Sequence, residues 1–130
     1  AIREADTDGN AATTKDASWT PLLGTPSFPS YTSGHSTFSA AAANVLTELF
    51  GNNVAFTTFA DPGSTGQWPP SKDVSALASR SFTSFAKAAD EAGLSRIYGG
   101  IHYSFDNTAG ASSGDSVGTW VVDHLLKPKP

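Results

Sequence analysis

Residues 34–51 read GHSTFSAAAANVLTELFG and predict the clearest helix of the chain. Thr32 or Ser33 can cap its first turn, and Gly51 stands where a glycine commonly ends a helix. Apolar side chains recur at helical spacing through the stretch. Its four consecutive alanines carry little side chain, so a second helix can approach closely. We therefore predict a helix over residues 34–50 that packs against other helices.

Three further stretches on the C-terminal side predict helices, over residues 72–92, 94–107 (interrupted at its glycine pair) and 113–126. Ser71 can cap the first of them, and Gly93 would end it. In the last helix, four apolar side chains recur at helical spacing and are expected to face inward: Val117, Trp120, Val121 and Leu125.

The rest of the chain has the composition of loops. Residues 1–5 resemble the tail of a helix, three prolines keep residues 21–31 extended, and residues 52–71 are rich in Gly, Pro, Thr and Ser. No stretch has a convincing strand pattern. The sequence predicts an all-α helical bundle of four main helices joined by long Pro/Gly-rich loops, in a single helical domain over residues 1–130.

Composition excludes several classes of function. The chain has 130 residues, a net charge of −4 and 38% apolar residues. Its basic residues are scattered, so no stripe of Lys and Arg predicts a nucleic-acid partner. It has no cysteine, which excludes disulfides and thiolate chemistry within the chain. No apolar run approaches the roughly 18 residues that a membrane-spanning helix needs.

The tripeptide Ser33-Gly34-His35 lies at the start of the predicted helix 34–50. The first backbone N–H groups of a helix have no intrahelical partner, and the helix dipole adds positive charge there. Together they form an anion site, which Gly34 leaves open to close approach. Ser33 adds a hydroxyl donor, and His35 adds a proton carrier. A simple helix cap with a solvent-exposed histidine is the alternative interpretation.

A second set of polar residues lies in SRIYGGIHYSFDN at residues 95–107. His102 and Asp106 are four residues apart, which would place them on one face of a helix. A carboxylate bound to one imidazole nitrogen leaves the other free as nucleophile or metal ligand. Arg96 offers a planar set of donors that suits phosphate-like oxygens. The alternative is a surface Asp–His pair beside an unrelated arginine.

Taken together, the two segments resemble signature motifs of a known superfamily. It contains the type-2 phosphatidic acid phosphatases, the bacterial acid phosphatases and the vanadium-dependent haloperoxidases. Ser95, Arg96, His102 and Asp106 match the spacing of its third motif, and PSYTSGHSTFSAAAA at 29–43 matches its second. Within this superfamily, the amino-acid sequences of both segments resemble the vanadium-dependent haloperoxidase family more than the phosphatases.

This resemblance implies a role for each matching residue. His102 would bind the vanadium of vanadate axially. The equatorial oxygens would be bound by Arg96, by Ser33 and by the Gly34 backbone N–H. The implied catalytic residues are His35 as acid/base, His102, and Asp106, which would hold His102. Phe28 would line a halide pocket. Phosphate is the alternative occupant of the same cradle.

The family's first motif, which supplies a lysine and a second arginine, has no counterpart in these residues. AIREAD at 1–6 resembles the sequence that follows it. We therefore expect the chain to be the C-terminal part of a longer vanadium haloperoxidase-like protein, with the rest of that chain as a partner.

The activity implied is oxidation of halide by hydrogen peroxide. The alternatives are a phosphomonoester hydrolase with His102 as nucleophile, and a non-catalytic helical domain of a larger protein. Because such enzymes are often exported, an extracellular or periplasmic location is expected. The faces of small residues would also suit an oligomer.

Overall fold

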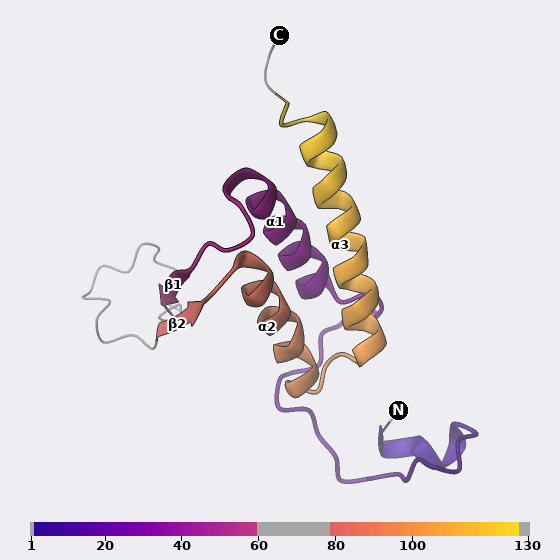
Figure 1. The fold of residues 1–130 in the computed structure, drawn as a ribbon. Helices are drawn as coiled ribbons and strands as arrows, with labels where there is room; N and C mark the ends of the chain where they lie inside the picture. Colours follow the sequence, from indigo (N-terminus) through magenta and orange to yellow (C-terminus); the bar gives the residue numbers. More distant parts are fainter. Residues whose placement is uncertain (1, 60–78, 128–130) are drawn as a thin grey trace.

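The computed structural model describes residues 2–59 and 79–127. In this part of the chain three α-helices form a bundle: α1 (Gly34–Phe50), α2 (Phe85–Tyr98) and α3 (Ser104–His124). A 3₁₀ helix, η1 (Ile2–Thr7), precedes them, and two short strands lie between α1 and α2. α1 packs most extensively against α3 and also against α2, whereas α2 and α3 contact each other only slightly (Figure 1). The predicted all-α helical bundle is confirmed.

The helix predicted over residues 34–50 is confirmed at both ends. Ser33 is the N-cap of α1, and its hydroxyl accepts a hydrogen bond from the Ser36 backbone N–H at 3.4 Å. Gly51 is the C-cap, with a positive φ of 97° that glycine adopts readily, and its N–H donates to the Thr47 carbonyl. Local capping signals therefore predicted this element correctly.

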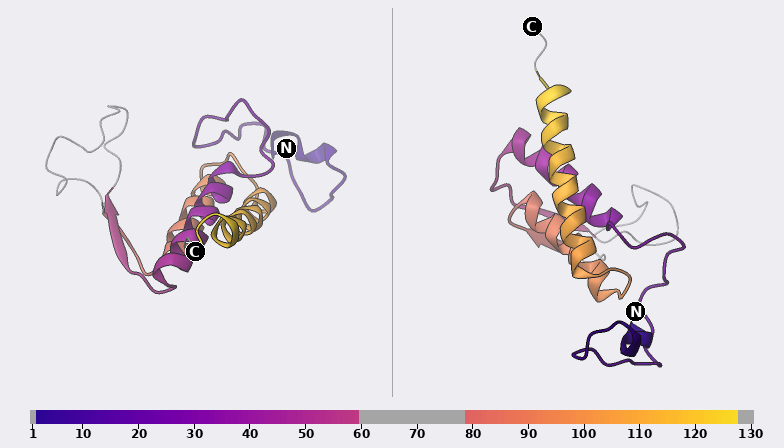
Figure 2. Two further views of the ribbon diagram at one scale, coloured as in Figure 1. Left: turned by 90° about the horizontal axis from the view of Figure 1, so that it is seen from above. Right: turned by 90° about the vertical axis from the view of Figure 1, so that its right-hand side faces the viewer.

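The boundaries predicted for the other helices are wrong. The start of the helix predicted over 72–92 lies outside the described residues, and its middle forms a strand, β2 (Ser79–Phe82), antiparallel to β1 (Phe56–Phe59). Ser84 rather than Ser71 caps the helix that follows. α2 continues past Gly93 to Tyr98, so the stretch predicted at 94–107 is divided between α2 and α3. α3 is continuous and also includes most of the stretch predicted at 113–126. The hairpin extends to one side of the bundle, as Figure 2 shows.

The side of α3 that faces α1 consists of glycines, not of large apolar side chains. Gly110, Gly114 and Gly118 are buried one turn apart, and each backbone lies directly against α1. A Cβ atom at Gly110 would lie 2.6 Å from the carbonyl oxygen of Ser33, closer than real Cβ contacts allow. The two helices can pack at this distance only because these three positions carry no side chain.

The last helix was predicted to turn a stripe of apolar side chains inward, and this prediction is wrong for most of these side chains. Val117 is 52% exposed, Trp120 53% and Leu125 64%, because α1 occupies the opposite, glycine face. Among the described residues, the buried hydrophobic side chains are only alanines, whereas Ser33, Ser36, His102 and Asp106 are buried polar ones. The best-buried part of the domain is a polar junction.

Candidate oxyanion-binding site

The two predicted motifs meet where α1 and α3 begin and α2 ends, at the lower end of the bundle in Figure 1. The backbone N–H of Ser33 donates to the carbonyl oxygen of Asp106 at 3.1 Å, which joins the motifs directly. Ser33 and Asp106 are both fully buried. Their position is fixed by the glycine face of α3, because Gly110 packs against the Ser33 carbonyl.

Ser33-Gly34-His35 forms the N-terminal end of α1, a helix of 17 residues. Free N–H groups and the positive end of the dipole are therefore present at this junction. A Cβ added to Gly34 would meet only Phe38, at 3.9 Å, so open space lies beside its backbone. This arrangement allows an anion to approach the first turn of α1.

His102 and Asp106 contact each other, but they do not share one face of a helix, as the spacing predicted. His102 precedes α3, and Asp106 lies in the first turn of that helix. Oδ2 of Asp106 lies 3.3 Å from Nδ1 of His102 and also accepts the Tyr103 backbone N–H at 3.1 Å. The carboxylate thus caps the helix and orients the imidazole with one oxygen. Nε2 of His102 has no hydrogen-bond partner among the described residues.

Arg96 and His35 complete the polar set. Arg96 is half-buried in the last turn of α2, where its Nε donates to Oγ of Ser95 at 3.0 Å. His35 is exposed in the first turn of α1. Partial burial lowers the pKa of His35 below its usual value, and the nearby positive charge of Arg96 and His102 lowers it further. The charges of Arg96 and His102 therefore act on the His35 imidazole.

This environment predicts how His35 titrates. We expect its imidazole pKa to lie below the usual value of about 6.5 in the free protein, because partial burial and, after it, the neighbouring cations disfavour its protonated form. A bound oxyanion adds negative charge and should raise that pKa. NMR titration of the His35 ring, with and without inorganic phosphate, measures both values. Arg96→Gln should raise the pKa of the free protein, and an unchanged pKa in that variant would contradict the assignment.

Phe28 lies in the loop before α1 and is 62% exposed. A depression of about 660 Å³ lies next to His102, and its wall includes Arg3, Trp19, Ile101 and Tyr103. The N-terminal segment thus borders the junction.

Two polar residues of the junction were not predicted from the sequence. Oγ of Ser36 lies 2.9 Å from Oγ of Ser33 and 2.6 Å from Oδ1 of Asn107. Ser36 is three residues after the helix cap, and Asn107 directly follows Asp106. Their adjacency to predicted site residues was the available signal, but contact between them depends on the packing of α1 against α3.

Comparison with known proteins identifies this class of domain. The family model "VCPO second helical-bundle domain" matches residues 3–128. The chain is similar to the crystal structure described as the first bacterial vanadium-dependent iodoperoxidase, with 47% identity and a TM-score of 0.68. That alignment covers 85% of this chain and 24% of the iodoperoxidase chain.

A holo-type bacterial vanadium-dependent chloroperoxidase has the same fold, with a TM-score of 0.62 at 21% identity; the alignment covers 82% of this chain and 23% of the other. A search of curated proteins gave no match. The helical bundle of this chain is thus a known type of domain. The chain belongs to the vanadium-dependent haloperoxidase family, as a second helical-bundle domain. It spans about a quarter of the length of the two solved enzymes.

Proposed function

We propose that this domain contributes to the vanadate site of a haloperoxidase that oxidises halide with hydrogen peroxide. The observation that carries the proposal is the junction itself, where the Ser33 N–H bond to Asp106 joins an anion-binding helix end to the His102 segment. The 47% identity to an iodoperoxidase supports the same chemistry.

The donors at the junction suit a tetrahedral oxyanion. In this proposal Arg96, Ser33 and the Gly34 backbone N–H bind vanadate oxygens, and His102 binds vanadium through Nε2, the ring nitrogen that faces away from Asp106. When bound, vanadate supplies the centre at which hydrogen peroxide is activated. A site of fixed donors stabilises charge on such a centre better than water does.

His35 is the proton carrier of the proposed site. Its lowered pKa keeps the imidazole neutral near pH 7, so it can accept a proton from a group bound at the end of α1. Asp106 is a positioning residue, since it contacts His102 and not the ligand. Phe28 remains our proposal for the halide pocket.

The proposed partners are halide, hydrogen peroxide and the rest of a longer chain of this protein. Large apolar side chains are exposed on α1 and α3, among them Phe38 at 78% and Phe105 at 59%. Exposed apolar surface commonly marks an interface. None of the described helices is long and apolar enough to cross a membrane. An extracellular or periplasmic location stays part of the proposal.

The test compares two activities of the complete protein. After removal of bound oxyanion, added vanadate should restore peroxide-dependent halogenation of a phenol indicator, with little hydrolysis of p-nitrophenyl phosphate. Hydrolysis without halogenation would favour the phosphatase alternative. Neither activity would favour a non-catalytic domain.

Variants assign the activity to the junction. His102→Ala is expected to lower halogenation by about 100-fold or more, since a preorganised group at the reacting centre is removed. His124→Ala is the matched control, because that imidazole lies exposed on α3 and stacks on Trp120. Full activity of both His102→Ala and His35→Ala would exclude the proposed site.

A further inference from the structure

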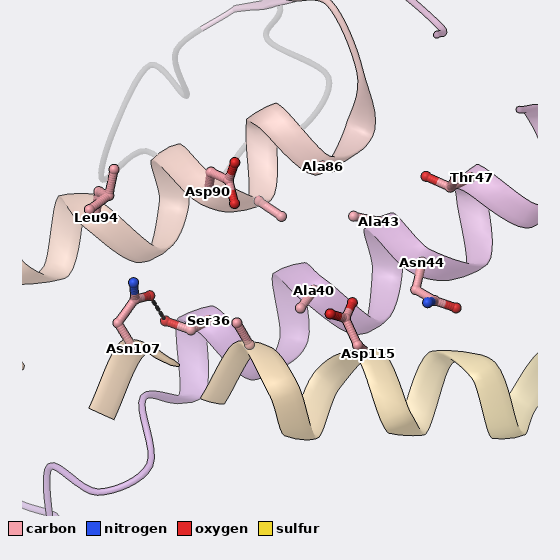
Figure 3. Close-up of a pocket in the computed structure, with 12 residues that line it drawn as sticks. Ser36, Ala40, Ala43, Asn44, Thr47, Ala86, Asp90, Leu94, Asn107 and Asp115 are labelled. Carbon is pink, nitrogen blue, oxygen red and sulfur yellow. Dashed lines mark hydrogen bonds between the residues drawn. The ribbon is translucent and has the colours of Figure 1, made fainter. Parts of the chain in front are cut away.

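A chain of three polar side chains connects the candidate site with the interior of the bundle. Asn107 of α3 contacts Ser36 of α1, and Ser36 contacts Ser33, the N-cap of the same helix. Figure 3 shows Asn107 and Ser36 joined by their hydrogen bond at the edge of a cavity between the three helices. The cavity has a volume of about 440 Å³. We call Asn107, Ser36 and Ser33 the polar relay.

The number of hydrogens decides the direction of this relay. Oδ1 of Asn107 can only accept, so the single hydroxyl hydrogen of Ser36 is given to it across 2.6 Å. Oγ of Ser36 is also placed to donate to Oγ of Ser33 at 2.9 Å, so the two acceptors compete for one hydrogen. When Asn107 takes that hydrogen, the contact between the two hydroxyls can be made only by donation from Ser33. In this orientation the Ser33 hydroxyl offers lone pairs, which repel an oxyanion.

Turning the Asn107 amide by 180° reverses the relay. Nδ2 then donates to Ser36, Ser36 donates to Ser33, and the Ser33 hydrogen is free for an external acceptor. The two ends of an amide have nearly the same size, so this rotation requires little repacking. The amide lies against Gly93 of α2, where an added Cβ would overlap with Oδ1 of Asn107. Gly93 thus provides the space that the amide occupies.

We propose that Asn107 is a positioning residue that decides, through Ser36, whether the Ser33 hydroxyl donates to a bound oxyanion. The inference rests on the proposed oxyanion site. This role requires a side chain that can both donate to and accept from Ser36, as the Asn107 amide can. A carboxylate would accept from Ser36 in every orientation and would keep the Ser33 hydrogen turned inward.

The test is a double-mutant cycle on the affinity of the complete protein for inorganic vanadate and, separately, for inorganic phosphate. Asn107→Asp is expected to weaken binding by about tenfold, the usual effect of losing one hydrogen bond to a charged group. In the Ser33→Ala background only the repulsion between the added carboxylate and the oxyanion remains, so the same substitution should weaken binding clearly less than in the wild type, because no hydroxyl remains to be oriented. Thermal unfolding of each variant separates affinity from stability.

Removal of Ser36 provides a rescue that a purely structural role would not show. Ser36→Ala takes away the acceptor that competes for the Ser33 hydrogen, so its affinity should stay within about threefold of the wild type. Adding Asn107→Asp to Ser36→Ala should then have only the smaller effect of the added negative charge. If Asn107→Asp does not fold, Asn107→Ala, which only removes atoms, replaces it in the cycle with an expected loss of about threefold.

The outcomes separate the relay from the site itself. Equal losses with and without the Ser33 hydroxyl would overturn the relay and leave the oxyanion site standing, as would an unchanged affinity in Ser33→Ala. Failure of the wild-type complete protein to bind either oxyanion would overturn the proposed function and the relay together.

Discussion

Gly114→Val is expected to disrupt the packing of α1 against α3 and to lower the free energy of unfolding by about 3 kcal/mol or more. An added Cβ at this position would overlap with the carbonyl oxygen of Thr37 and would lie 2.9 Å from Cβ of Ala40. The first obstacle is backbone, so it cannot turn away as a flexible side chain would. Chemical denaturation of the complete protein, followed by circular dichroism, measures the loss.

Ser113→Val is the control for this substitution. It places the same β-branched side chain one residue earlier in α3, at an exposed position. Its expected effect is a few tenths of a kcal/mol, the difference in helix propensity alone. Equal stability of the two variants would mean that the glycine face of α3 does not set the distance between the helices.

Replacing Asp106 should affect stability and the candidate site together. Asp106→Ala leaves the buried Nδ1 of His102 and the Tyr103 N–H without their shared acceptor, and we expect a loss of about 3 kcal/mol. Asp106→Asn can keep both contacts, since both are made to the same oxygen. It loses the charge, however, and buries an N–H₂ group at Oδ1, where the described residues offer no partner.

The asparagine variant therefore separates the two roles. We expect it to fold and to bind vanadate about 10–100-fold more weakly, because the carboxylate no longer fixes and polarises the histidine. Isothermal titration of the complete protein measures this affinity, and Asp115→Ala, an exposed carboxylate on the same helix, is the control. Wild-type affinity in Asp106→Asn would show that the charge of Asp106 has no part in the site.

Much of the candidate site could be predicted because its signals are local. Ser33 caps a helix whose composition already predicts it, and the spacing of Arg96, His102 and Asp106 resembles one family motif. The family predicted from these segments is confirmed by the match over residues 3–128. The assigned roles of the site residues stay predictions for the experiments above.

The errors in the helices have a physical cause. Helical periodicity of apolar residues predicts a buried face only where burial of large side chains drives packing. In α3 the buried face is made by Gly110, Gly114 and Gly118, which hydropathy patterns do not detect, although their regular spacing of four was visible. The strand Ser79–Phe82 was missed because it forms only by pairing with Phe56–Phe59, a segment that ends 20 residues before it in the sequence.

By itself, the sequence determined the all-α class, the helix over residues 34–50 and the two polar motifs, because capping, composition and motif spacing are properties of short segments. Only the tertiary structure decided how these segments combine. Close contact of α1 with the glycine face of α3 brings Ser33 to Asp106 and Ser36 to Asn107. Such contacts depend on the distance and rotation of two packed helices, which neither segment specifies alone.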